Sequence, residues 1–524
     1  MRSEGVEVID ADEDARLAAI AASLSAADER FDADRQAYAE QLPDELPGED
    51  ALTLHVDDFS IISNLKDIRA IEGYPARAFV RARDGDLVAG TFPPIPGYTD
   101  YLSGHLGLGT PTYIRANPAP GAPVYAGFAA LLGDEEAQRK IEDKVRDVDR
   151  DFWFHPYMGL EAAWRFARRM TDRCGRPARV LGPLPTITER ANNKLWFTEV
   201  VTAVLGSESA LDSRAARSPG EVCDRLVATA RLVDGDASGA RVVLKLSDSA
   251  SGMGTSIFEP DAILARSPES LRAFVDDWLD AHEWSPQAPP LSIERWESPV
   301  LGSPSIQLWI PPLPVGADPA GAAPSTPQPS GAAPAAAEPS GAAPILEGVF
   351  DQIFYPDNET VFLGGVPTHL PDPIVDRIGE AGVRIGRVFQ RLGYVGRCSF
   401  DTILVGDDLT NATIKFNECN GRWGGTSTPM SLMNRLFGDY REQPYSCRNF
   451  SAGNLKGVRF DELRAKLGSV LYDARSGDGW AILFNLGCLE PAGKFDLITL
   501  GETFEEADGR QGDFGELATR LFHS

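Results

Sequence analysis

Three polar side chains recur at every second residue near the end of one predicted strand. Glu418, Asn420 and Arg422 lie in the run Ile-Lys-Phe-Asn-Glu-Cys-Asn-Gly-Arg, which begins at Ile414. Because side chains of a strand alternate between its two faces, this spacing places the three on one face, together with Ile414 and Phe416. Oxygen ligands beside a guanidinium are groups that bind magnesium and phosphate. The run therefore predicts a polar site at the end of an apolar strand.

A second predicted strand, residues 399–405, precedes this one and carries Asp401. A symmetric hairpin that pairs Val405 with Ile414 places Asp401 opposite Glu418. Directly opposed residues have Cβ atoms about 4.5–5.5 Å apart, and two carboxylates at that spacing repel each other unless a cation neutralises them. The pair therefore predicts a divalent metal site. The alternative is that Asp401 lies in solvent at a strand end and that Glu418 forms an ion pair with the nearby arginine.

A lysine lies within an apolar run that leads into a loop of small residues. Lys245 is part of Val-Val-Leu-Lys-Leu, residues 242–246, where an unpaired ammonium group would be costly. The following residues, 247–256, include Gly252 and Gly254, and glycine lets a backbone approach phosphate oxygens closely. The run lacks both the Gly-Lys-Ser/Thr ending of a P-loop and the Gly-x-Gly-x-x-Gly of a dinucleotide fold. It predicts a triphosphate site of another kind.

Taken together, these motifs resemble the ATP-grasp superfamily over residues 192 to about 440. The resemblance implies that ATP binds between two small sheets with one or two Mg²⁺ ions, or with Mn²⁺. It makes Asp401, Glu418 and Asn420 the metal ligands. The nucleotide contacts that it implies are Lys194 and Lys245 on the phosphates, Ser251, Gly252, Gly254 and Thr255 in a glycine loop, and Glu294, Trp296 and Glu297 in a hinge that holds adenine and ribose.

The residues alone leave alternatives open for part of this set. Lys194 could be a surface lysine of a helix, and a solvated strand end would equally explain Glu294 and Glu297. Cys419 is adjacent to the proposed ligands, but strand alternation places it on the opposite face, where we expect it to pack in the interior.

A narrower resemblance rests on two further segments. Residues 422–429, Arg-Trp-Gly-Gly-Thr-Ser-Thr-Pro, and the C-terminal run from residue 479 are similar to pheganomycin-type ATP-grasp peptide ligases. The resemblance implies an ADP-forming enzyme of secondary metabolism that joins a small-molecule carboxylate to an amine, both amino acids or peptides, through an acyl phosphate. Lys245 would neutralise charge during phosphoryl transfer. Arg422 and Arg397 would hold the carboxylate or the acyl phosphate.

The sequence departs from this family at three positions. Thr428 stands where a histidine is expected, Asn485 where another histidine is common, and Asp496 where glycine is expected. If that histidine takes part in acyl transfer, its replacement affects the choice of acceptor or the second half of the reaction. Two alternatives therefore stay open: an ATP-grasp kinase, and an ATP-binding protein that has lost catalysis.

The composition of the chain indicates which kinds of partner it is not expected to bind. The chain has 524 residues, 43% of them hydrophobic, and a formal net charge of −27. Nucleic acids and anionic membranes both require basic surfaces, so neither is expected as a partner. We see no signal peptide and no apolar run of membrane-spanning length. The six cysteines are dispersed and are expected to be reduced thiols, which favours a cytoplasmic enzyme. The superfamily resemblance also allows a homodimer.

The expected organisation is three-part. Residues 1–185 form an N-terminal helix and a small α/β domain, residues 186–450 the α+β ATP-grasp core, and residues 451–524 a short C-terminal α+β domain. We expect an amphipathic helix over 11–31 that packs on the body or on a partner subunit. The other expected elements are a strand over 77–83, helices over 134–173 and a strand over 178–182.

Residues 316–344 stand apart from the rest. Pro-Ala-Gly-Ala-Ala-Pro and two copies of Pro-Ser-Gly-Ala-Ala-Pro recur there every ten residues. Such a composition cannot bury a core, so we expect a disordered or polyproline-like excursion. Because predicted strands flank it at 304–310 and 346–353, the segment is interpreted as a loop inserted between strands. An interdomain linker is the alternative.

Overall fold

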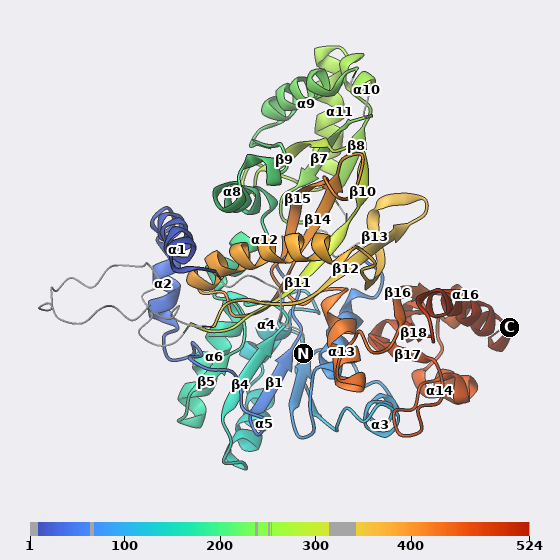
Figure 1. Cartoon of the computed structure of the whole chain (residues 1–524). Helices are drawn as coiled ribbons and strands as arrows, with labels where there is room; N and C mark the ends of the chain where they lie inside the picture. The colour runs from blue at the N-terminus through green and yellow to red at the C-terminus, as the bar shows by residue number, and fades with distance from the viewer. Residues whose placement is uncertain are drawn as a thin grey trace, which may run out of the picture.

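The described strands form three sheets (Figure 1). The computed structural model describes residues 9–62, 68–235, 239–249, 252, 254–313 and 342–522. One sheet is parallel and lies in the N-terminal third of the chain, whereas the other two are antiparallel. The predicted fold class, an α+β core that follows a smaller α/β layer, is confirmed by this arrangement.

The N-terminal sheet has the strand order β3-β2-β1-β4-β5, and all its described pairs are parallel. Parallel neighbours need crossover connections, which helices on the sheet faces provide here. The strand predicted over 178–182 is confirmed as β5. The bounds are β1 Leu52–Val56, β2 Leu87–Gly90, β3 Thr112–Arg115, β4 Phe152–Pro156, β5 Ala178–Val180, α3 Tyr98–Gly104, α4 Gly127–Gly133, α5 Glu135–Arg146 and α6 Glu161–Cys174.

Two local predictions in this region are wrong. Instead of a strand over 77–83, a 3-10 helix, η2 (Ile71–Val80), is observed. Most of η2 is buried, and its residues Ala76, Ala78, Phe79 and Val80 pack in one core with residues of the C-terminal part of the chain. The helical stretch predicted over 134–173 is interrupted by β4, whose buried aromatic residues pair with β1 and β5.

The helix predicted over 11–31 is in fact two helices, α1 (Ala11–Ala26) and α2 (Arg30–Ala37). Leu17 of α1 is buried in the same core as the parallel sheet. Asp14 of α1 forms ion pairs at 2.7 Å with both Arg387 and Arg391 of α12 (Asp372–Arg391). The N-terminal helix therefore packs on the body of its own chain.

Replacing Asp14 by asparagine should lower the free energy of unfolding at neutral pH by about 3–5 kcal/mol, because two buried guanidinium groups lose their carboxylate. Burial raises the pKa of Asp14, but Arg387 and Arg391 outweigh it, so the net pKa is lowered. The stabilisation is therefore fully present above the ordinary aspartate pKa of about 4 and is lost as pH falls through the lower folded value. Urea unfolding across this range measures it. Equal destabilisation by Asp12→Asn, at an exposed position of α1, would contradict it.

The smaller antiparallel sheet, order β6-β9-β7-β8, has a core of its own. It lies with α9, α10 and α11 at the top of Figure 1, apart from the parallel sheet. Three helices share this core with the sheet, and other side chains of the sheet line a cavity that is described below. The bounds are β6 Ser213–Ala216, β7 Arg241–Leu246, β8 Thr255–Phe258, β9 Leu291–Trp296, α9 Pro219–Val233, α10 Pro260–Leu264 and α11 Pro268–Ala281.

The larger antiparallel sheet has the order β10-β14-β11-β12-β13-β16-β18-β17, and β15 also pairs with β14. Strands on both sides of residue 450 belong to it, so the C-terminal segment extends this sheet; the division into domains stays a prediction. The bounds are β10 Val300–Gly302, β11 Pro304–Ile310, β12 Ile345–Tyr355, β13 Asn358–Pro367, β14 Gly396–Val405, β15 Thr413–Asn420, β16 Tyr445–Ser451, β17 Ala481–Phe484 and β18 Lys494–Leu500.

The strands β11 and β12 are antiparallel neighbours in this sheet, with Ser305 paired to Phe350. The strands predicted at 304–310 and 346–353 are thus confirmed, and the repeat-containing segment joins two adjacent strands. Most of that segment, residues 314–341, lies outside the described residues.

The remaining helices connect these layers. Within the described ranges, none is long and apolar enough to cross a membrane. Their bounds are α7 Pro185–Ala191, α8 Lys194–Leu205, η3 Ser207–Ser209, α13 Ser427–Phe437, η4 Gly453–Leu455, α14 Phe460–Leu467, η5 Gly468–Val470, η6 Leu486–Cys488, α15 Leu489–Ala492 and α16 Phe504–Leu521.

Candidate active site

Residues from both antiparallel sheets line one cavity of about 590 Å³. The smaller sheet contributes Lys245 and Glu294, and the larger sheet contributes Asp401, Glu418 and Asn420. A cavity of this size suits a nucleotide-sized ligand. The structure thus brings together residues as far apart in the sequence as Lys194 and Arg422, which were predicted to act at one site.

Asp401 is paired with Glu418, as predicted, but the hairpin reaches that pairing differently. Val405 pairs with Thr413 rather than with Ile414, so the predicted register is wrong at the turn. A register shift between the Asp401 and Thr402 pairs then inserts Asn417 as an extra residue in β15. This β-bulge restores the opposition of the two carboxylates.

The bulge also changes which face carries the apolar residues of β15. Phe416 was predicted to share a face with Glu418, and this is wrong: it packs in the core, with ring centroids 6.4 Å from Phe197 and 6.2 Å from Phe400. Glu418 and Asn417 line the cavity instead. Since a bulge adds one residue to a two-residue period, side chains beyond it switch faces. Cys419 is buried in the core, as expected.

The two carboxylates have different environments. Asp401 accepts hydrogen bonds from Ser305 Oγ at 2.7 Å and from Asn420 Nδ2 at 3.0 Å. Burial and the charge of Glu418 raise the pKa of Asp401 to about 6. Burial also opposes ionisation of Glu418, but its pKa is lowered overall, chiefly because Lys194 lies 3.1 Å away.

The carboxylate oxygens of Asp401 and Glu418 and the amide oxygen of Asn420 are ligands of the kind that magnesium prefers. In the described part of the chain, no three His, Cys, Asp or Glu side chains form a metal cluster. A metal held here would therefore have two carboxylates and the Asn420 amide as its protein ligands, and the rest of its shell would be water or phosphate. Mg²⁺ binds in this way, because it retains several waters and takes few carboxylates.

Lys194 is buried, with 6% of its surface exposed, so the surface-lysine alternative is excluded. It is the first residue of α8, whose N-terminus is capped by Asn193 Oδ1 on Trp196 N–H. Its Nζ donates to the Ser249 carbonyl at 2.6 Å and lies beside Glu418. Lys194 thus connects the loop after β7 to the carboxylate pair.

Lys245 and Glu294 form a buried ion pair of 2.6 Å across neighbouring strands β7 and β9. The Glu294 carboxylate also accepts from Ser213 Oγ at 3.0 Å and from Ser292 Oγ at 2.8 Å. With 2% exposure, Glu294 is no solvated strand end. Its burial opposes ionisation, but Lys245 lowers its pKa overall, so it serves here as the counter-ion of the lysine.

Trp296 and Glu297 line the cavity at the end of β9. Arg241 lies over the Trp296 ring at 5.1 Å, and Glu297 forms an ion pair of 2.7 Å with Lys415. Glu297 is 8% exposed, so the solvated alternative is excluded for it too. Both residues remain candidates for the adenine and ribose contacts.

Two glycines of the predicted glycine loop are described, and one of them, Gly252, lines the cavity beside β13. Gly252 and Gly254 have φ angles of +71° and +72°, a region that favours glycine. A Cβ added at Gly252 would lie 1.9 Å from the Thr360 carbonyl oxygen, so the close approach requires glycine. Thr255 lines the cavity at the start of β8. Ser251 lies outside the described residues.

The two predicted arginines have different positions. Arg422 lines the cavity and donates to Asn192 Oδ1. Arg397 is not among the cavity residues: its guanidinium pairs with Glu347 at 2.5 Å and lies over the Trp423 ring at 4.5 Å. The structure therefore does not bring Arg397 to the cavity with Arg422, and its proposed contact with the substrate stays a prediction. Although strand alternation puts Arg397 on the face of Asp401, its side chain points to the half-buried carboxylate of Glu347.

Thr428, which replaces the family histidine, is buried on α13 and also does not line the cavity. Its Oγ1 makes no hydrogen bond to any residue of the described ranges. Thr428 therefore contributes no side chain to the lining of the cavity. Sequence analysis did not predict two residues of the site. Ser305 donates a hydrogen bond to Asp401, and Asn417 accepts one from Lys245. Strand pairing places the first and the bulge places the second, and neither belongs to a local motif.

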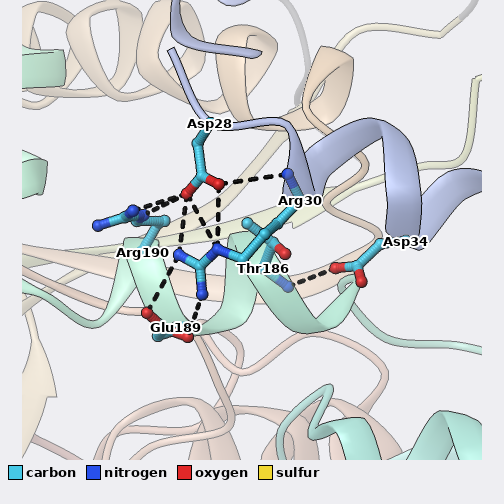
Figure 2. Close-up of polar contacts among 6 residues, drawn as sticks. All are labelled: Asp28, Arg30, Asp34, Thr186, Glu189 and Arg190. Atoms are coloured by element: carbon cyan, nitrogen blue, oxygen red, sulfur yellow. Dashed lines mark hydrogen bonds and ion pairs between the residues drawn. The ribbon is translucent and has the colours of Figure 1, made fainter. Parts of the chain in front are cut away.

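A second cavity, of about 540 Å³, meets the first at Lys194, Glu418, Asn420 and Arg422. Arg30 and Glu189 are among its lining residues, and Figure 2 shows that Arg30 of α2 donates hydrogen bonds to both Asp28 and Glu189. Asp34 of α2 accepts a hydrogen bond from the Thr186 N–H of α7 at 2.7 Å, and both residues line the second cavity. Glu418 therefore lines both cavities.

The comparisons with known proteins concern structure alone. No protein-family profile and no curated protein matches the sequence. N5-carboxyaminoimidazole synthase from Aspergillus clavatus, with ADP and 5-aminoimidazole ribonucleotide, has a similar structure at 12% identity, covering 90% of this chain and 100% of that one, TM-score 0.48. Biotin carboxylase from Campylobacter jejuni, described as a β-γ-ATP complex, has 11% identity over 87% of this chain and 89% of that one, with a TM-score of 0.47.

A putative ATP-grasp superfamily protein from Archaeoglobus fulgidus shows 12% identity over 78% of this chain and 96% of that one, TM-score 0.37. Likeness at these values does not give the reaction of this chain. None of the three is named as a peptide ligase, so the narrower resemblance stays a prediction.

Proposed function

We propose that this chain is an ADP-forming ATP-grasp ligase that joins a carboxylate to an amine, with amino acids or peptides as substrates. The observation that carries the proposal is the convergence of two buried lysines, Lys194 and Lys245, with the opposed carboxylates Asp401 and Glu418 around one cavity. Cationic groups and oxygen ligands together are what phosphoryl transfer from ATP requires of a protein.

Each residue has a proposed part in binding. Lys194 and Lys245 contact the phosphates, and the ion pair with Glu294 holds the second lysine in place before ATP binds. Trp296 and Glu297 hold adenine and ribose. Asp401, Glu418 and Asn420 hold Mg²⁺, which when bound neutralises charge on the phosphate oxygens.

The proposed reaction has two steps. A carboxylate oxygen of the donor forms a bond to the γ-phosphorus while the bond to the bridging oxygen breaks, and ADP leaves with that electron pair. The amine nitrogen of the acceptor then bonds to the carbonyl carbon of the acyl phosphate. The bond to phosphate breaks, the nitrogen loses a proton, and an amide and phosphate result. Arg422, at the junction of the two cavities, holds the reacting carboxylate.

The experiment is ADP release from Mg-ATP with a panel of amino acids and short peptides, with and without hydroxylamine. Hydroxamate formation with a particular carboxylate supports the proposal and identifies the donor. A stable phosphorylated product that hydroxylamine does not consume identifies a kinase. Tight ATP binding without ADP release across the panel would indicate a binding protein that has lost catalysis.

A further inference from the structure

The cavity has a second polar end, formed by segments at opposite ends of the chain. Tyr74 and Arg77 come from η2, and Lys494 and Asp496 come from β18. All four line the same cavity as Lys245 and Glu418. None of them has a part in the nucleotide and metal contacts proposed above.

Arg77 is the central residue of this end. Only 9% of it is exposed, and its Nε has no hydrogen-bond partner among the described residues. The nearest carboxylate oxygen, from Asp496, lies 3.6 Å from that nitrogen, and the guanidinium lies over the Tyr74 ring at 4.6 Å. A guanidinium carries five N–H donors, and leaving buried donors unsatisfied is costly. A ligand that accepts hydrogen bonds would remove that cost.

The charges at this end favour an anion. Lys494 is half-buried and its Nζ lies 2.5 Å from the Tyr74 hydroxyl. Arg77 and Lys494 bring two positive charges against one negative charge on Asp496. The neighbouring Arg448 is already paired with Asp508 and adds no net charge. One excess positive charge remains, which matches a single carboxylate.

Apolar side chains adjoin the charged ones. The ring of Phe59 packs edge-on to Tyr157 at 4.5 Å and to Tyr74 at 6.3 Å, and all three rings line the cavity. Ile71, also in the lining, lies on η2 with Tyr74. A carboxylate site beside an apolar wall suits an amino acid with an apolar side chain.

We propose that Arg77 and Lys494 bind the carboxylate of an apolar amino acid or peptide that serves as the amine acceptor. This inference rests on the ligase function proposed above. The donor carboxylate loses its charge when it is phosphorylated, whereas the carboxylate of an amino-acid acceptor is unchanged throughout the reaction. A fixed cationic end therefore suits the acceptor. Asp496, beside Arg77, holds the guanidinium in place.

The test compares free and capped acceptors. Apolar L-amino acids, from leucine to phenylalanine, are assayed against their carboxamides with the donor found by hydroxamate formation. We expect the free acids to have a KM at least about 10-fold lower, as charged hydrogen bonds typically give. Lys494→Met should raise the KM for the free acids about 10-fold or more and remove the preference over the amides. Lys456→Met, at an exposed position outside the cavity, should preserve the preference.

The double variant Arg77→Met/Asp496→Asn provides a second test that removes both buried charges together. It too should lose the preference for free acids, with rates normalised to hydroxamate formation by the same variant. Equal use of acids and amides by the unaltered enzyme, or hydroxamate formation without any amino-acid product, would overturn this inference alone. Failure to form a hydroxamate from any donor would overturn the proposed function, and this inference with it.

Discussion

Glu418→Gln should lower kcat for ATP turnover about 10²–10³-fold at ordinary magnesium concentrations, the range seen when one preorganised electrostatic contact is removed. Glutamine keeps the shape of the side chain but removes the negative charge opposite Asp401 and beside Lys194. The metal site would lose one of its two carboxylates. Steady-state ADP release as a function of magnesium measures this effect, and we expect the magnesium requirement to rise as well.

The matched control is Glu199→Gln. Glu199 lies on α8 with Lys194 but is exposed, so the same chemical change there should leave both kcat and the magnesium dependence unaltered. Turnover by Glu418→Gln at the rate of the unaltered enzyme would contradict the assignment of the metal ligands.

Lys245→Met should both abolish measurable turnover and destabilise the fold by about 3–5 kcal/mol. The stability loss arises because Glu294, 2% exposed, would keep a buried carboxylate without its counter-ion. Urea unfolding measures it. The double variant Lys245→Met/Glu294→Gln removes the unpaired charge, so we expect most of the stability to return while turnover stays absent.

This pair of variants separates structure from function at Lys245. Recovery of turnover in the double variant would show that the lysine serves the fold alone. Lys140→Met provides the surface comparison, because Lys140 pairs with Glu136 on an exposed helix face. Such a pair contributes about 0.3–0.5 kcal/mol, so this variant should unfold almost as the unaltered protein does.

The pairing of Asp401 with Glu418 was predicted correctly, but the hairpin register from which it was predicted is not the one observed. The opposition of Asp401 and Glu418 was predicted from a regular hairpin, yet the register differs at the turn and Asn417 forms a bulge. The one-residue difference at the turn and the one-residue bulge cancel, so that the two carboxylates are still paired. Hydrophobic alternation alone cannot locate a bulge, because the extra residue is fixed by pairing along the whole strand and by packing of Phe416 in the core.

Other features depend on contacts that no local pattern contains. Arg397 follows the alternation of β14, but its guanidinium forms an ion pair with the half-buried Glu347 of β12. Arg77 was predicted on a strand, whereas packing against C-terminal residues places it on a 3-10 helix at the cavity. Motifs therefore predicted the lysines, the glycines and the carboxylates. The cavity end formed by Arg77 and Lys494 could be found only from the folded chain, since its two segments are more than 400 residues apart.

The central claim is that the substrate carboxylate itself attacks ATP. The most direct measurement uses a donor labelled with ¹⁸O in its carboxylate, with Mg-ATP and the amine acceptor, and determines the isotope in the released phosphate by mass spectrometry. The acyl-phosphate route transfers one ¹⁸O from the donor to each phosphate formed. Phosphate without ¹⁸O, released together with ADP, would contradict the account and identify the protein as an ATPase.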